Sequence, residues 1–572
     1  MKTQKLIITL FLSLCFIFSK AQSPFYFTGY GRALIAKSAY NENSNYVKND
    51  TTSAKKSLAG NFVFDLGINV KPSEILKANV ILRVNNQFGG FFSTGSLLEF
   101  RQIQIHGILA KKIAYSLGDI DLQMTKYTLF NSYEATRSEF EAEAFKIRRN
   151  IIDYDNFNNG NQWRVQGIQL KTKIEFEKII KDLSLSAFGS RIKASNFINT
   201  PDRLLYGGTL KIHQGKSLDL GINFIGINDL PGTAQDTVVS YANKIITGDF
   251  AYTYSTRNLN FIAKSELGTS NSDMFQAKEN KRIKNYDHFI DASLGVKHKY
   301  LPFKIFVSYR FIGNEYYSAG AQSRRINDNI HPTLLPNGLG GSNNRNMNIF
   351  DRFTDLNLYN KTITTTLSYY LPMYNNVLPY GAATPNRKGY TLETEYGNSD
   401  SVFYAQVNAQ MLSEVIGVGI SQKRNFILFN AGATLNLHKI IGCKKLLAVS
   451  SAIKYENTQG ATAAKINLQS SIVDFALTFE ILKNLNFSSG IKFLNAKGSE
   501  NIILRDAFNN ITSYEQFKVG NTQSIITTGL IYHLSKQTSF AANAFWQLNN
   551  NHQNSNENYA VHQLFFSYLL KF

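Results

Sequence analysis

Cysteine, proline and tryptophan are scarce in this chain. Its 572 residues include 2 Cys, 10 Pro and 2 Trp. No run of about 20 apolar residues follows the N-terminal region, which excludes a bundle of membrane-spanning helices. Hydrophobic residues make up 43% and aromatic residues 13% of the chain, which excludes a disordered protein. Of the two cysteines, only Cys443 lies outside the N-terminal segment, which excludes an intramolecular disulfide and a cysteine-based metal site in the mature chain.

The N-terminal segment 1–21 reads as a secretory signal peptide. Two lysines precede the apolar stretch Leu6–Phe18, which is too short to span a bilayer as a helix. Small residues then predict cleavage before Gln22. An uncleaved anchor is the alternative. A lipoprotein signal is rejected because Leu14 precedes Cys15, where a small residue is expected.

Most of the remaining chain consists of segments in which every second residue is apolar. Asn61–Val70, Phe303–Phe311 and Val473–Ile481 are clear examples. This period of two is typical of β-strands with one apolar face. The opposite faces carry amides and ionised groups, which suits strands that face water on one side and lipid on the other.

The connections between these segments alternate between short and long, as in a transmembrane β-barrel. Predicted short turns include Lys71–Leu76 and Leu301–Pro302. The predicted long loops include Leu129–Asn161, Thr269–Asp287, Asn314–Asn360 and Lys497–Gly520.

The C-terminal segment carries the most specific pattern. Leu564, Phe566, Tyr568, Leu570 and the final Phe572 share one face. This ending resembles the C-terminal signature of bacterial outer-membrane β-barrel proteins, including the porins. The resemblance implies an all-β, antiparallel transmembrane barrel formed by residues 22–572 as a single domain. It also implies that Tyr568, Leu570 and Phe572 form the signal read by the barrel-insertion machinery.

Counting segments predicts about 24 strands, with 20 to 22 nearly as well supported. The weakest region is Asp400–His438, where Leu412–Ser421 can be a short strand, a bulge or an excursion. The first predicted strand, Phe25–Lys37, leaves no room for an N-terminal plug of the kind that energised transporters carry. We therefore expect no energy-coupled uptake.

Basic residues outnumber acidic residues, with 61 Lys and Arg against 41 Asp and Glu, which gives a net charge of +20. Its distribution does not predict nucleic-acid binding, because many surplus cations fall in or beside the short turns. There they would face anionic lipid headgroups or simply solvent. The predicted pore-lining residues are of mixed sign: Asp65, Arg83, Asp219, Lys264, Glu266, Asp291, Lys304, Arg310, Asp474 and Glu480.

The loop Leu129–Asn161 contains a predicted helix, roughly Ser138–Arg149. Ser138 and Glu141 fit a capping box, and apolar residues follow at helical spacing. Folded into the barrel, this helix would narrow the pore. An ordinary helix in a surface loop is the alternative. The candidate constriction residues are Glu139, Glu141, Glu143, Arg148 and Arg149.

No local motif predicts catalysis, a cofactor or a metal site. The chain has no His-Glu-x-x-His pair, no Gly-x-Ser-x-Gly elbow and no phosphate-binding loop. The run 153–156 begins like a calcium loop but lacks the glycine and glutamate that would follow. The Asn- and Gly-rich loop Asn314–Asn360 can bind a sugar or a partner protein, or can be a solvated external loop. We therefore expect a protein that is not an enzyme.

The leading hypothesis is a porin-like channel for passive diffusion of small hydrophilic solutes, located in the outer membrane of a Gram-negative bacterium. The alternative is a barrel scaffold or accessory subunit of a secretion, motility or surface-polysaccharide complex. Expected partners are outer-membrane lipid and lipopolysaccharide, the insertion machinery during biogenesis, and protein partners in the scaffold case.

Overall fold

The structure is a computed structural model of the whole chain. It describes residues 25–41, 56–87, 96–132, 139–155, 160–177, 179–215, 217–322, 376–418, 421–460, 466–505, 511–555 and 558–572. The expected signal peptide, Ser138 and most of the Asn- and Gly-rich loop lie outside these ranges.

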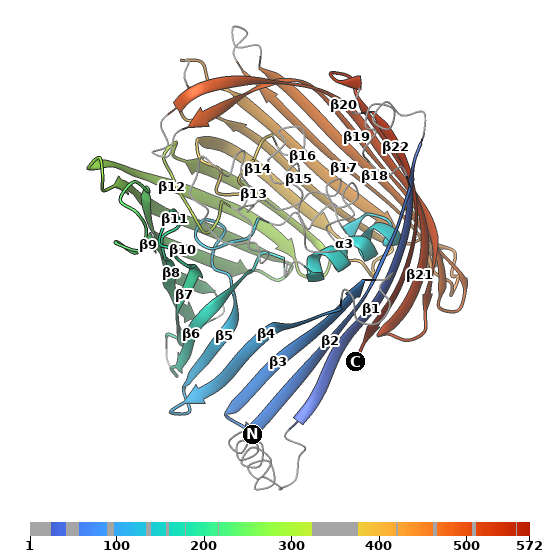
Figure 1. The fold of residues 1–572 in the computed structure, drawn as a ribbon, viewed down its shortest axis with the longest axis horizontal. Coiled ribbons are helices and arrows are strands. Elements are labelled where there is room, and N and C mark those ends of the chain that lie inside the picture. Colours follow the sequence, from blue (N-terminus) through green and yellow to red (C-terminus); the bar gives the residue numbers. More distant parts are fainter. Residues whose placement is uncertain are drawn as a thin grey trace.

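The described residues form a closed antiparallel barrel of 22 strands (Figure 1). Each strand pairs with the next along the chain, and β1 pairs with β22 to close the ring. The predicted fold class is confirmed, and the strand count lies within the predicted range of about 20 to 24. The strands are β1 (Phe25–Tyr40), β2 (Lys56–Ser73), β3 (Leu76–Gln87), β4 (Ser96–Leu109), β5 (Ile113–Leu122), β6 (Trp163–Glu175), β7 (Asp182–Lys193), β8 (Arg203–Gln214), β9 (Leu218–Asp229), β10 (Ser240–Ser255), β11 (Leu259–Gln276), β12 (Lys281–His298), β13 (Phe303–Ile312), β14 (Arg387–Tyr396), β15 (Phe403–Ser413), β16 (Asn425–Leu435), β17 (Leu447–Gln459), β18 (Asn467–Leu482), β19 (Leu485–Arg505), β20 (Ile511–His533), β21 (Thr538–Asn551) and β22 (Tyr559–Lys571).

Side chains alternate between an exposed outer face and a buried inner face. In β18, Val473 and Phe475 are exposed, whereas Ile472, Asp474 and Ala476 are buried. The alternation follows from the extended backbone, in which successive side chains point to opposite sides. Large apolar side chains recur on the outer face of nearly every strand, as expected of a barrel surrounded by lipid.

Short and long connections fall at opposite ends of the barrel. Short turns follow most even-numbered strands, as at 74–75 after β2 and 483–484 after β18, and most longer connections follow the odd-numbered strands. The first strand begins and the last strand ends on the side of the barrel that carries the short turns. The two termini meet there, since the N–H of Gly29 donates to the carbonyl of Phe572 at 2.8 Å.

The predicted extents of two loops are wrong. Thr269–Asp287 and Lys497–Gly520 belong largely to strands, because β11 and β12 continue to a turn at 277–280, and β19 and β20 continue to 506–510. In the distal parts of β11 and β12 most side chains on both faces are polar, so the sequence shows little apolar alternation although the backbone ladder continues. In the segment 497–520 apolar residues are present but do not recur at every second position. The uncertain region after β15 proves to be an excursion, of which residues 414–418 and 421–424 are described.

Two helices are described outside the barrel wall. The helix α3 (Glu143–Asp155) lies across the inside of the barrel (Figure 1), and α5 (Leu437–Ile440) is a single turn between β16 and β17. Within the described ranges, no helix combines the length and apolar character that crossing a membrane requires.

The C-terminal aromatic ring packs at the seam between β22 and β1. The ring of Phe572 stacks on that of Phe64 at 5.9 Å between centroids, and a side chain added at Gly29 would occupy the place of the Phe572 ring.

Substitution of Phe572 by Ala should lower the free energy of unfolding by about 1 kcal/mol, because a half-exposed ring contributes about half of a fully buried side chain. Urea unfolding in detergent micelles measures this, with Lys571→Ala as the exposed neighbouring control. Equal midpoints for the two variants would contradict the packing role.

Candidate functional site

The connection between β5 and β6 runs through the barrel interior. We call its described residues, 123–132, 139–155 and 160–162, the internal segment. It joins two adjacent strands, yet Phe140 stacks on Tyr404 of β15 at 5.5 Å, and α3 contacts β19 and β20 on the far wall. The candidate constriction residues therefore lie inside the barrel rather than in a surface loop.

The helix within this segment starts and ends later than predicted. It spans Glu143–Asp155 instead of Ser138–Arg149. The carbonyl of Ala142 accepts the N–H groups of Phe145 and Lys146 at its start. The side chain of Glu141 forms ion pairs with Lys492 and Arg149, an arrangement that the capping-box pattern does not predict.

Apolar contacts dock the internal segment on the wall. Ala142, Ala144, Phe145 and Ile151 are all at most 1% exposed and pack with inward-facing residues of β1 and β18–β22. Two wall glycines provide the space. A side chain added at Gly432 would meet the ring of Phe140, and one added at Gly490 would meet Ala142 and Phe145. The close approach of segment and wall therefore depends on residues without side chains.

A buried charge network holds the C-terminal end of α3. Asp155 pairs with Arg32 at 2.9 Å and with Arg83 at 3.4 Å. Asp65 accepts two hydrogen bonds from Arg83, at 2.6 and 2.7 Å, and lies 3.3 Å from Arg101. None of these side chains is more than 4% exposed. Buried charges of this kind are tolerated only when paired, so the wall arginines and α3 depend on each other.

Tyr154 adds a neutral donor to the same network. Its hydroxyl donates to Asp65, and its ring lies 4.2 Å from the guanidinium carbon of Arg101. Burial is the largest cause that raises the pKa of the Tyr154 phenol above its usual value, so the group remains protonated.

A second network lies at the N-terminal end of α3. Lys492 is 2.9 Å from Glu141 and also donates to Asp474, and all three side chains are 1% exposed. Further along α3, the buried Arg148 donates to Gln563 and lies over the rings of Phe545 and Phe565. Glu139 accepts a hydrogen bond from Tyr404 at 2.7 Å, and Glu143 lies 4.0 Å from His533. These charges bind the wall rather than face one another across an open pore.

A third network fixes the start of the internal segment. The hydroxyl of Tyr127 donates to Asp291, which lies 2.7 Å from Lys126 and 3.6 Å from Arg310. The hydroxyl of Tyr316, in the connection after β13, donates to the carbonyl of Tyr127 at 2.8 Å. The segment is therefore anchored on β12 and β13 at one end and on β1–β4 at the other.

The predicted pore-lining residues separate into three groups. Asp65, Arg83, Asp291, Arg310 and Asp474 are buried in the charge networks. Asp219 and Glu480 lie near short turns, where they contact His213 and the N–H groups of Leu446 and Asn484. Of the remaining three, Lys264 is exposed near the ring of Phe306, Glu266 has a buried carboxylate oxygen, and Lys304 lines a cavity.

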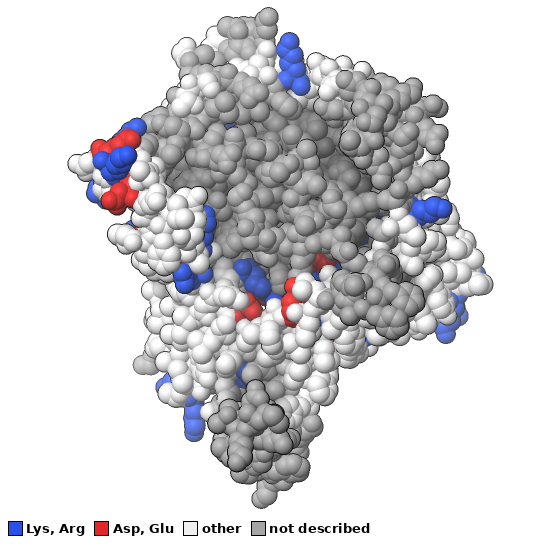
Figure 2. Space-filling model, in the orientation of Figure 1, with Lys and Arg blue, Asp and Glu red and all other residues white. Residues whose placement is uncertain are grey.

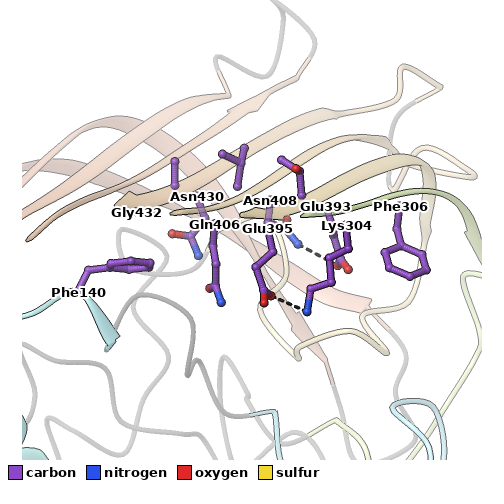
Figure 3. A pocket seen from close by; sticks show the side chains of 12 residues that line it. Phe140, Lys304, Phe306, Glu393, Glu395, Gln406, Asn408, Asn430 and Gly432 are labelled. Atoms are coloured by element: carbon purple, nitrogen blue, oxygen red, sulfur yellow. Dashed lines mark hydrogen bonds and ion pairs between the residues drawn. The ribbon is translucent and has the colours of Figure 1, made fainter. Parts of the chain in front are cut away.

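That cavity, which we call the wall pocket, lies on β13–β16 and has a volume of about 240 Å³. Strand register builds it from two neighbouring rungs, Lys304–Glu395–Gln406–Gly432 and Phe306–Glu393–Asn408–Asn430. Lys304 pairs with Glu395 at 2.6 Å, and Asn408 donates to Glu393 at 3.0 Å. The rings of Phe140 and Phe306 stand at its two ends, with the polar groups between them (Figure 3).

Sequence reasoning missed five polar residues of this pocket: Glu393, Glu395, Gln406, Asn408 and Asn430. The signal was present, because Glu393 and Glu395 alternate with Leu392 and Tyr396 in β14. Their assembly with Lys304 is not visible in the sequence, because it depends on the register of strands joined by the connection 313–386.

The outer surface and the described ion-binding groups give no further candidate. Charges of both signs gather over the tip of the β11–β12 hairpin (Figure 2), where Arg282 lies 2.5 Å from Asp273. Among the residues described, no three His, Cys, Asp or Glu side chains are placed to hold a metal ion.

Substitution of Asp155 by Asn should loosen α3, because it removes the carboxylate that pairs with Arg32 and one of the two carboxylates that pair with Arg83. Breaking a buried pair costs about 3–5 kcal/mol, so amide hydrogen exchange in α3 should accelerate by roughly one hundredfold or more. Exchange read by mass spectrometry measures this, with Asp236→Asn in an exposed loop as the control. Unchanged exchange in α3 would contradict the anchoring role of Asp155.

Comparison with known proteins identifies a fold but no family. No protein-family model matches the chain, and a search of curated proteins finds no match. Among solved structures, the ferric citrate transporter FecA aligns with 97% of this chain and 80% of its own, at 9% identity and a TM-score of 0.50. The copper transporter OprC aligns with 97% and 81% at 9% identity and a TM-score of 0.49, and Pseudomonas aeruginosa OccK2 aligns with 96% of both chains at 8% identity and 0.34. At these identities the likeness concerns the fold alone, and the fold is that of the bacterial outer-membrane β-barrels.

Proposed function

We propose that this protein is an outer-membrane channel for passive diffusion of small hydrophilic solutes, with the internal segment narrowing the path. The observation that carries the proposal is the wall pocket, a cavity with polar and apolar lining groups left between the barrel wall and Phe140 of the internal segment. Inward-facing ionic and amide groups replace part of the hydration that a polar solute loses in a narrow passage.

The outer surface supports the membrane location. Exposed apolar side chains such as Leu294, Val307 and Phe475 cover the strands. A soluble protein rarely exposes continuous apolar surface of this extent. Outer-membrane lipid and lipopolysaccharide would surround this belt, and the insertion machinery would read the C-terminal strand ending in Phe572.

The direct test is single-channel recording of the purified barrel in a planar bilayer, with the reversal potential measured under a salt gradient. We expect steady conductance with weak ion preference, because the wall pocket and its surroundings carry both signs of charge. A correctly folded barrel that never conducts would overturn the channel proposal.

The internal segment should limit this conductance. Substitution of Gly490 by Val places a side chain where Ala142 and Phe145 dock, so the segment should be displaced and the conductance steps should become larger. Gly189→Val is the matched control, since a side chain added at Gly189 meets nothing within 4 Å. Identical steps in both variants would contradict the narrowing role.

A second candidate function is a scaffold or accessory subunit of an envelope complex. The observation that favours it is the extent to which the chain packs its own interior: residues of the internal segment form three apolar clusters with the wall. A silent barrel that co-purifies with a defined protein partner would support this alternative.

A further inference from the structure

The wall pocket combines two aromatic rings with a row of polar groups. Phe140 and Phe306 bound its ends, and Lys304, Glu393, Glu395, Gln406, Asn408 and Asn430 lie between them (Figure 3). We propose that the pocket binds a neutral sugar of about one hexose ring. This inference rests on the proposed channel function and names the class of solute.

The size of the cavity sets the first limit. The cavity has a volume of about 240 Å³. This is below the range of about 300–1,000 Å³ typical of pockets for drug-sized ligands. A single sugar ring suits a space of this size.

The hydrogen-bonding groups match a ligand that both donates and accepts. The carboxylates of Glu393 and Glu395 each accept one described hydrogen bond or ion pair and keep further acceptor sites. The carbonyl oxygen of Gln406 is buried and accepts no hydrogen bond from the described residues, although its amide donates to Tyr404. Sugar hydroxyls donate to such acceptors and accept from the ammonium group of Lys304.

The aromatic rings favour a ligand with an apolar face. Phe140 is held by stacking on Tyr404, at an interplanar angle of 25°. Phe306 lies over Gly295 of the neighbouring strand, where a side chain would collide with its ring. Both rings are therefore fixed in place. Phe306 is partly exposed, so the C–H face of a sugar ring can pack on it while the sugar hydroxyls turn to the polar row. Phe140 is 1% exposed and closes the other end of the pocket.

The charges around the pocket are balanced, which favours a neutral sugar. Lys304 lies against Glu393 and Glu395. Three further charges lie nearby: Lys264 beside Phe306, Glu139 beside Tyr404, and Arg310, which interacts with Glu393. Three acids and three bases leave no net charge to offset the desolvation of a carboxylate or of a cation.

Isothermal titration of the purified full chain in detergent tests this proposal with three probes that share one ring: D-glucose, D-glucosamine and D-glucuronate. We expect glucose to bind and glucuronate to bind at least about tenfold more weakly. Equal or tighter binding of glucuronate, binding of glucosamine alone, or no binding of glucose would each overturn the assignment to a neutral sugar.

Two substitutions test whether glucose binds in the wall pocket. Glu393→Gln and Phe306→Leu should each weaken glucose binding by about tenfold, through a lost acceptor and a lost ring face. Glu177→Gln, in the exposed turn after β6, is the matched control and should bind like the unmodified chain. Heat-modifiable gel mobility confirms that each variant is a folded barrel, and unchanged affinity in both folded pocket variants would overturn the location.

Channel recordings on the same protein separate this inference from the proposed function. Steady conductance without glucose binding overturns the sugar site and leaves the channel intact. Glucose binding to a barrel that never conducts overturns the channel and leaves the sugar site.

Discussion

The hydrogen-bonded ring of strands is the constraint on which the rest of the structure depends. Because lipid offers no partner to an open backbone edge, β22 has to return to β1, and the pairing from Tyr30–Lys571 to Tyr40–Val561 accomplishes this. Closure fixes which side chains face inward. The inner face then carries arginines, lysines and acids from many strands, brought into a space that is largely shielded from water.

The internal segment supplies partners for those inward charges, which offsets the free-energy cost of burying them. Asp155 and Glu141 reach Arg83 and Lys492, which belong to strands on different sides of the ring. The same groups that make the interior polar therefore serve mainly to hold a second layer of chain within it. What remains for a solute is the space that this layer leaves uncovered, above all the stretch of wall on β13–β16.

Period-two alternation could predict the barrel because the side of the sheet to which each side chain points is set by the local backbone conformation. It failed where both faces are polar, as in the distal halves of β11 and β12. The charge of the inner face could also be predicted, as Asp65 and Arg83 show, but its role could not. The partners that decide that role, such as Glu141 with Lys492 or Phe140 with Gly432, lie far apart in the sequence and meet only once the ring is closed.

The long β11–β12 hairpin rises beyond the neighbouring strand on one side. β12 pairs with β13 only from Phe289 onward, so residues 281–287 present a free sheet edge among the described strands. Such edges invite pairing with another chain. This one carries Lys281, Arg282 and Lys284, all exposed. Charged side chains along a sheet edge hinder such pairing, so neighbouring copies can crowd in one membrane without their sheets merging.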